Sequence, residues 1–222
     1  MHFLKKYRIF FMVFAVFSVI TISLFYNALK PKKTLPIYNP SMVNPELVDS
    51  TVQYVANDHK IADFAFTNQN GKMITQKDYE GKIYVADFFF TTCGSICPKM
   101  TANMVDVQKA ILNNPKVMLL SHTVLPEIDS VPVLKKYALE KGVDDRKWNL
   151  VTGDKKDIYT MARKSYLAVK IGKPEELYDM VHTENFVLVD AKRRVRGFYD
   201  GTNKDDVKRL IEDINFLSNE KP

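Results

Sequence analysis

The chain has 222 residues and a formal net charge of +6, from 32 basic and 26 acidic side chains. Residues 1–45 hold six basic and no acidic side chains, so the remainder carries 26 of each and offers no electrostatic basis for binding nucleic acid. Two cysteines in a chain of this length exclude a scaffold held together by several disulfides.

The first predicted element is a membrane-spanning helix. Residues 1–8 form a short basic segment, and residues 9–29 contain no charged side chain and consist mostly of Phe, Val, Ile and Leu. An apolar run of about 20 residues has the length that a helix needs to cross a bilayer. The run is longer than the apolar core of a cleaved signal peptide, lacks a small-residue cleavage site and is followed by no cysteine for lipid attachment, so an uncleaved anchor is predicted. Three basic side chains flank the run on each side, so the positive-inside rule selects no orientation.

A tether and one globular domain follow the anchor. Residues 30–51 contain four prolines and little apolar periodicity, which predicts an extended tether. Residues 52–222 are long enough for one domain with one core, whose last apolar residues lie near Leu217.

The domain shows an alternation of strand and helix patterns. The expected order is strand 63–67, strand 83–90, helix 98–113, strand 117–124, helix 130–141, strand 148–151, helix 154–168, strands 186–189 and 195–199, and helix 203–217. This order predicts an α/β fold in which helices flank a mixed sheet. The strand at 83–90 is nearly all apolar, as expected for a strand buried on both faces at the centre of the sheet.

Both cysteines lie between that central strand and the following helix. Cys93 is in the loop, and Cys97 precedes Pro98, which suits the first position of a helix. A thiolate at a helix amino terminus is stabilised by the exposed N–H groups and the helix dipole. A purely structural disulfide between these positions would close a very small loop and add little stability. Two chemistries remain open: thiol–disulfide exchange, or binding of a soft metal such as Cu(I) or Zn(II). The three intervening residues favour a metal bridging two thiolates over the tighter spacing of redox pairs.

A metal site would need a third ligand. His182 begins a core strand at what should be the same end of the sheet, so it is favoured among the four histidines. His122 ends a predicted strand and is expected to be a surface or hydrogen-bonded residue rather than a ligand.

Over roughly residues 55–217, the sequence resembles the Sco/SenC family of copper proteins. The elements that carry the resemblance are Thr92-Cys-Gly-Ser-Ile-Cys97-Pro98, Thr123-Val-Leu-Pro-Glu-Ile-Asp129, His182 ahead of Phe186-Val-Leu-Val-Asp190, and Val195-Arg-Gly-Phe-Tyr-Asp-Gly201. The resemblance implies a thioredoxin-like domain outside the cytoplasm, on the periplasmic side of a bacterial inner membrane. It also implies that copper, as Cu(I) or Cu(II), is bound by Cys93, Cys97 and His182.

The family is associated with delivering copper to, or reducing the cysteines of, the binuclear copper centre of cytochrome c oxidase. The implied partners are the oxidase subunit that carries this centre, thiol reductants, other copper carriers and the membrane. Two positions depart from the family pattern: Gly94 stands where proline is usual, and Leu125 stands where aspartate is usual. Neither position is a ligand in the pattern, so copper binding is not directly affected, whereas the Leu125 change could alter a partner contact.

The rival hypothesis is a thiol–disulfide oxidoreductase that acts on partner cysteines. Asp87 precedes Cys93 by six residues, the offset at which thioredoxins place a buried proton acceptor, and Gly94 also matches their pattern. A carboxylate in an apolar strand has a raised pKa and can accept protons, although an aspartate at a solvated sheet edge would be merely structural. No proline precedes the strand near Phe186, where thioredoxins have one. A peroxiredoxin-type peroxidase would have a proline ahead of its Thr-Thr-Cys sequence, and this chain has phenylalanine immediately ahead of Thr91-Thr92-Cys93. The chain is therefore predicted to be a membrane-anchored copper metallochaperone, with thiol–disulfide exchange as the one enzymatic activity left open.

Overall fold

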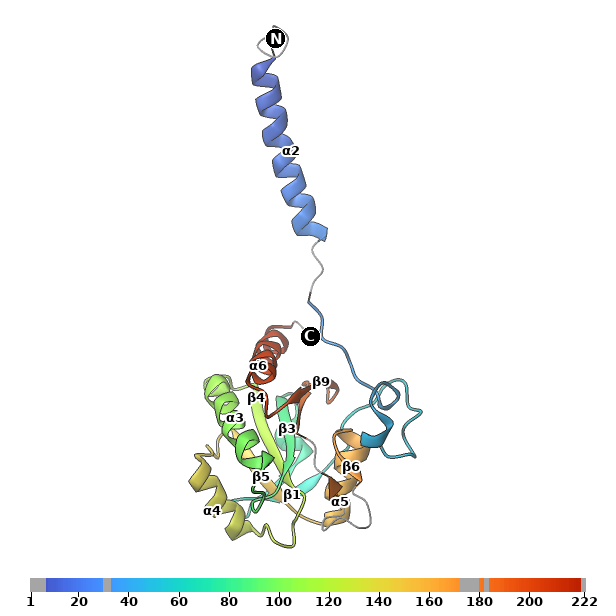
Figure 1. The fold of residues 1–222 in the computed structure, drawn as a ribbon, viewed down its shortest axis with the longest axis vertical. Coiled ribbons are helices and arrows are strands. Elements are labelled where there is room, and N and C mark those ends of the chain that lie inside the picture. Colours follow the sequence, from blue (N-terminus) through green and yellow to red (C-terminus); the bar gives the residue numbers. More distant parts are fainter. Residues whose placement is uncertain (1–6, 30–32, 172–179, 182–183, 221–222) are drawn as a thin grey trace. The chain divides into compact units, whose positions relative to one another are not determined.

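The computed structural model describes residues 7–29, 33–171, 180–181 and 184–220, and the chain divides into two compact units, Met1–Thr34 and Leu35–Pro222 (Figure 1). In the first unit, helix α2 spans Arg8–Leu29 and has no buried residue. Its apolar window has a mean hydropathy of 2.4, so this helix is long and apolar enough to cross a membrane.

The second unit begins earlier than the sequence predicts. Residues 35–51, expected to form an extended tether, pack on the domain and include two short 3-10 helices, η1 (Pro40–Met42) and η2 (Pro45–Leu47). The backbone N–H of Tyr38 donates to the carbonyl of Val195 at 2.9 Å, and the Arg196 guanidinium donates to the carbonyls of Leu35 and Pro36 at 3.0 Å. The side chain of Val48 is fully buried. The expected tether is therefore corrected for residues 35–51, because contacts with residues far along the chain hold this segment in place.

The domain is built on a mixed sheet. Its strands are β1 (Ala65–Asn68), β2 (Met73–Thr75), β3 (Ile83–Phe89), β4 (Val117–Thr123), β5 (Trp148–Thr152), β8 (Asn185–Val189) and β9 (Val195–Asp200). Within the described residues they form one seven-stranded sheet in the order β2-β1-β5-β4-β3-β8-β9. The pairs β3–β4 and β4–β5 are parallel, and the remaining pairs are antiparallel. A separate small sheet pairs β6 (Lys170–Ile171) with β7 (Met180–Val181).

Helices cover both sides of the sheet. They are η3 (Gln76–Tyr79), α3 (Ile96–Ile111), α4 (Val131–Lys141), α5 (Lys155–Thr160), the π-helix η4 (Met161–Ser165) that continues α5, and α6 (Lys204–Asn219). In Figure 1, α3 and α4 lie on one side of the strands and α5 lies on the other. The thioredoxin-like α/β architecture expected from the sequence is confirmed.

Strand β3 is the centre of the core, with all seven of its residues buried. It is flanked by β4 and β8, and its Asp87 pairs in register with Ser121 while Phe88 pairs with His122. Because successive side chains of a strand alternate between faces, Asp87 and Ser121 point to one face and Phe88 and His122 to the other. The strand delivers the cysteine loop at its carboxyl end.

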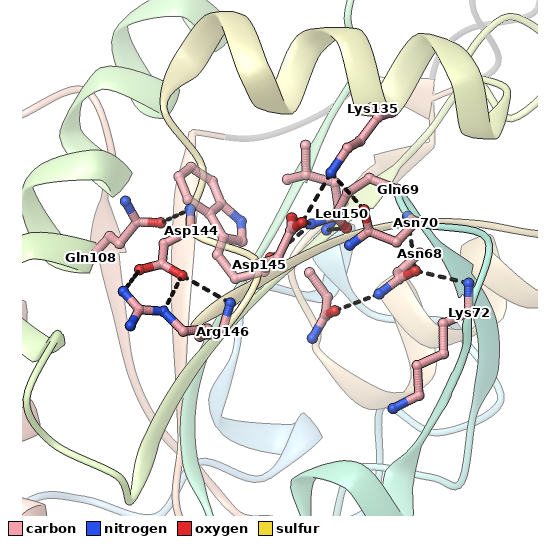
Figure 2. A network of polar contacts seen from close by, with 12 residues as sticks. Asn68, Gln69, Asn70, Lys72, Gln108, Lys135, Asp144, Asp145, Arg146 and Leu150 are labelled. Atoms are coloured by element: carbon pink, nitrogen blue, oxygen red, sulfur yellow. Dashed lines mark hydrogen bonds and ion pairs between the residues drawn. The ribbon is translucent and has the colours of Figure 1, made fainter.

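A polar network fixes the β1–β2 hairpin to β5 and α4 (Figure 2). The Gln69 side chain donates to Asp145 at 2.7 Å and accepts from the backbone N–H of Leu150 at 2.8 Å, so both ends of this buried amide are paired. Lys135 contacts Asp145 at 3.0 Å and donates to the Asn70 side chain at 2.6 Å. Buried amides paired in this way stabilise the hairpin in a single register.

Candidate functional site

The two cysteines lie where the carboxyl end of β3 meets the beginning of α3. Both are free thiols; Cys93 is 8% exposed and Cys97 is 1% exposed. Helix α3 begins at Ile96, two residues before the predicted start at Pro98. Cys97 is therefore the second residue of the helix, and Pro98 still lies in the first turn, where backbone N–H groups have no partner within the helix.

The two thiols differ in electrostatic environment. Burial alone would raise the pKa of Cys93, but hydrogen bonds from the backbone N–H groups of Ser95 and Cys97 outweigh it and lower this pKa. The Cys97 N–H lies 3.5 Å from the Cys93 sulfur, and the Ser95 hydroxyl lies 3.7 Å from it. Burial raises the pKa of Cys97, and the nearby Cys93 and Asp87 raise it further. Cys93 is thus the thiol that ionises first, and Cys97 keeps its proton until a ligand or a partner sulfur replaces it.

The carboxylate of Asp129 fixes the start of the cysteine loop at Thr91. This carboxylate is fully buried and accepts hydrogen bonds from the Thr91 backbone N–H at 3.1 Å and the Thr91 hydroxyl at 2.5 Å. It also accepts from the Thr123 hydroxyl at the end of β4. This tie fixes the loop two residues before Cys93 to the loop that leads into α4. Sequence reasoning placed Asp129 in a family motif but missed this role, because Thr91 lies 38 residues earlier in the chain.

Asp87, predicted as a candidate proton acceptor, is buried on the central strand and is not at a sheet edge. The Ser121 hydroxyl donates to its carboxylate and in turn accepts from the Trp148 indole N–H at 2.8 Å. Burial raises the pKa of Asp87 to about 7, with the Ser121 hydrogen bond opposing the rise. A carboxyl group with this pKa exchanges protons near neutral pH.

Of the two histidines considered as ligands, the structure describes only His122. His122 is fully buried on the sheet face opposite Asp87, stacked on Phe88 with ring centroids 5.2 Å apart. Burial lowers its pKa to about 3, and neither ring nitrogen has a hydrogen-bond partner in the described part of the chain. His122 is therefore a neutral core residue, not the surface or hydrogen-bonded residue that the sequence predicted, because the strand register turns its ring into the aromatic core. His182, the predicted third ligand, lies outside the described residues.

The described residues include no group of three or more His, Cys, Asp or Glu side chains that could hold a metal ion. They supply two sulfur donors four residues apart, one of which favours the thiolate. Such a pair is chemically suited to soft metals and to disulfide exchange alike.

Comparison with known proteins identifies the family. The SCO1/SenC family model matches residues 52–218. The SCO1 protein homolog of Bacillus subtilis (strain 168) is 34% identical over 162 residues, which cover 72% of this chain and 83% of the relative. The solved structure of BsSco, described as a member of the Sco family of cytochrome c oxidase assembly proteins with a disulfide switch, has 33% identity and a TM-score of 0.64 over 74% of this chain and 96% of its own. ScoI of Bradyrhizobium japonicum, solved with copper bound, shares the fold at 24% identity and a TM-score of 0.57, over 72% of this chain and 99% of its own. From the family match and the level of identity, this chain belongs to the SCO1/SenC family.

Proposed function

We propose that this chain is a membrane-anchored copper carrier that delivers copper to the binuclear copper centre of cytochrome c oxidase, with Cys93, Cys97 and His182 as its ligands. The observation that carries the proposal is the thiol pair at the beginning of α3, in which backbone N–H groups stabilise the Cys93 thiolate beside buried Cys97. Helix α2 would anchor the domain outside the cytoplasm, close to a membrane-bound recipient.

Copper is the cargo in this proposal, and the protein must bind it and then release it. Copper binds cysteine as the thiolate, so loading requires Cys97 to lose its proton. Asp87, with its pKa near 7, is the proposed acceptor, because its charge acts on the Cys97 thiol. Release proceeds by ligand exchange with the sulfur and nitrogen donors of the recipient, which keeps the coordination number nearly constant.

The test is a copper titration of the reduced full chain in detergent. Cys93→Ser and Cys97→Ser should abolish tight binding, and His182→Ala should weaken it and shift the metal–thiolate absorption, because each change removes a proposed ligand. His59→Gln is the matched control, because the His59 ring hydrogen-bonds the carbonyl of Ser165 at 2.8 Å, away from the cysteine loop. Unchanged copper affinity in His182→Ala would remove the third ligand and with it the carrier proposal.

A thiol–disulfide oxidoreductase is the second candidate, and the unequal thiols favour it. In that reaction the Cys93 thiolate attacks one sulfur of a partner disulfide, the partner's other sulfur leaves as a thiolate, and Cys97 then attacks Cys93 to release the reduced partner. The His182→Ala and Cys93→Ser variants distinguish the two functions. Turnover of a disulfide substrate that survives His182→Ala but not Cys93→Ser would favour the oxidoreductase.

A further inference from the structure

A second site lies at the opposite end of β3 from the cysteines. A pocket of about 610 Å³ is lined by residues from three stretches: those before β1, those from β2 to the start of β3, and the β8–β9 turn. Its lining includes Lys60, Gln76, Lys77, Glu80, Lys192 and Arg193. Strand β3 separates this pocket from the cysteine loop by about 20 Å, since its seven residues each rise about 3.3 Å. The volume is in the range of sites that bind small organic molecules.

The pocket wall contains a buried amide without partners. Gln76 is 6% exposed, and neither its side-chain nitrogen nor its oxygen has a hydrogen-bond partner in the described structure. Gln69, equally a buried glutamine, has both ends of its amide paired. Burying an unpaired amide is unfavourable, so such a group in a pocket wall indicates that a ligand supplies the missing partners. Both polar atoms of this amide are closed off from solvent in the structure, so a ligand reaches them only after the side chain changes rotamer, which the broad terminal torsion of glutamine permits.

The charges around the pocket favour an anion. Four cationic side chains line it, against the carboxylates of Asp63 and Glu80. Asp63 is already paired with Arg193 at 2.8 Å. The exposed lysines Lys60, Lys77 and Lys192 form no ion pair with any residue that the structure describes. The free positive charge thus exceeds the free negative charge.

Arg193 gives the pocket a rigid side. Its φ of 67° is in the left-handed region, which suits the β8–β9 turn, and its guanidinium donates to the carbonyl of Ile61 at 2.8 Å. The backbone N–H of Gln76 is fixed as well, because it donates to the carbonyl of Phe64 at 3.2 Å. The Arg193 guanidinium and the Gln76 main chain are therefore held by the fold before any ligand arrives, which reduces part of the entropic cost of binding.

We propose that this pocket binds the carboxyl terminus of an extended peptide. The free carboxylate would be held by the pocket lysines, and the last peptide group, which offers one N–H and one C=O, would pair with the donor and acceptor of the Gln76 amide. Capture of a terminal carboxylate is a recurring mode of peptide recognition. The pocket provides a docking point for a partner chain that is separate from the cysteine pair and independent of copper.

The test compares two forms of one probe, acetyl-trialanine with a free carboxyl terminus and the same peptide with a terminal amide, binding to the full chain in detergent. The proposed contacts are with the main chain and the carboxylate, so the probe needs no particular side chains. We expect the acid to bind about tenfold more tightly than the amide, because it gains charge-assisted hydrogen bonds. Gln76→Leu should weaken binding of the acid about fivefold, and Lys77→Ala should reduce the preference for the acid. Lys208→Ala, which removes an exposed charge from α6, is the matched control and should change neither.

Two further measurements on Gln76→Leu show whether the variant is folded and whether its cysteine site is unchanged. Gln76→Leu should fold and melt at or above the melting temperature of the parent, since it removes an unpaired amide, whereas Gln69→Leu should melt lower. The copper titration of Gln76→Leu should match that of the parent. Equal binding of the two peptide forms, no binding of either, or a loss of stability in Gln76→Leu as large as that in Gln69→Leu would overturn the proposal.

Discussion

The raised pKa of Asp87 predicts a specific dependence of stability on pH. In the unfolded chain this carboxyl group has its ordinary pKa of 3.8, and in the folded protein burial raises the pKa to about 7. Between these two values the folded state holds a proton that the unfolded state has lost. Stability therefore falls as pH rises through this range and levels off above it.

The size of the effect follows from the difference between the two pKa values. A difference of about three units corresponds to about 4 kcal/mol, at about 1.4 kcal/mol per unit. Asp87→Asn cannot ionise and keeps an oxygen to accept from the Ser121 hydroxyl. The variant should therefore match the parent near pH 4 and exceed its free energy of unfolding by up to about 4 kcal/mol near pH 8.

The assay is urea unfolding of parent and variant in detergent, followed by the fluorescence of Trp148, which lies in the same hydrogen-bonded chain. Glu212→Gln, which removes an exposed carboxylate from α6, is the control and should shift stability by no more than about 0.5 kcal/mol at any pH. Stability curves of the parent and Asp87→Asn that run parallel from acid to mildly alkaline pH would refute the reasoning, because they would show that Asp87 titrates alike in the folded and unfolded states.

Two other predictions concern the cysteine loop. The first is tested by alkylation with iodoacetamide across a pH series. In the Cys97→Ser variant, Cys93 should react with a midpoint below the ordinary pKa of a thiol, and in the Cys93→Ser variant, Cys97 should react slowly at every pH at which the protein stays folded. Equal midpoints for the two cysteines would contradict the difference in pKa between them. The second concerns Asp129. Asp129→Ala should lower the free energy of unfolding by about 3 kcal/mol, since it leaves the Thr91 and Thr123 donors unpaired, and should slow Cys93 alkylation, whereas Asp129→Asn should restore part of both. An Asp129→Ala variant whose Cys93 is alkylated as fast as in the parent would show that other contacts position the loop.

Local patterns predicted the centre of the domain well. The continuous apolar run of β3 indicated burial on both faces, and the helix after the cysteines was predicted within two residues at each end. The two-residue error at its start arose because proline suits the first helical position best but is tolerated throughout the first turn. These features depend on residues close together in the sequence.

Features that depend on distant residues could not be predicted. The segment 35–51 appeared extended because of its prolines, yet it is fixed by Arg196, Val195 and Arg163, which lie more than a hundred positions later. The Asp129 tie to Thr91 and the unpaired amide of Gln76 likewise follow from the three-dimensional arrangement. The position of Asp87 before Cys93 was evident from the sequence, but its hydrogen bond with Ser121 became clear only from the strand register.

The packing of residues 35–51 decides where a shortened protein for solution work should begin. A truncation that starts at Val52, where the family match starts, discards Val48 and uncovers the apolar surface beneath it. It also strips the guanidinium of Arg196, which is 4% exposed, of two carbonyl acceptors. A version that starts at Leu35 retains both, and we expect it to be the more soluble and the easier to purify of the two.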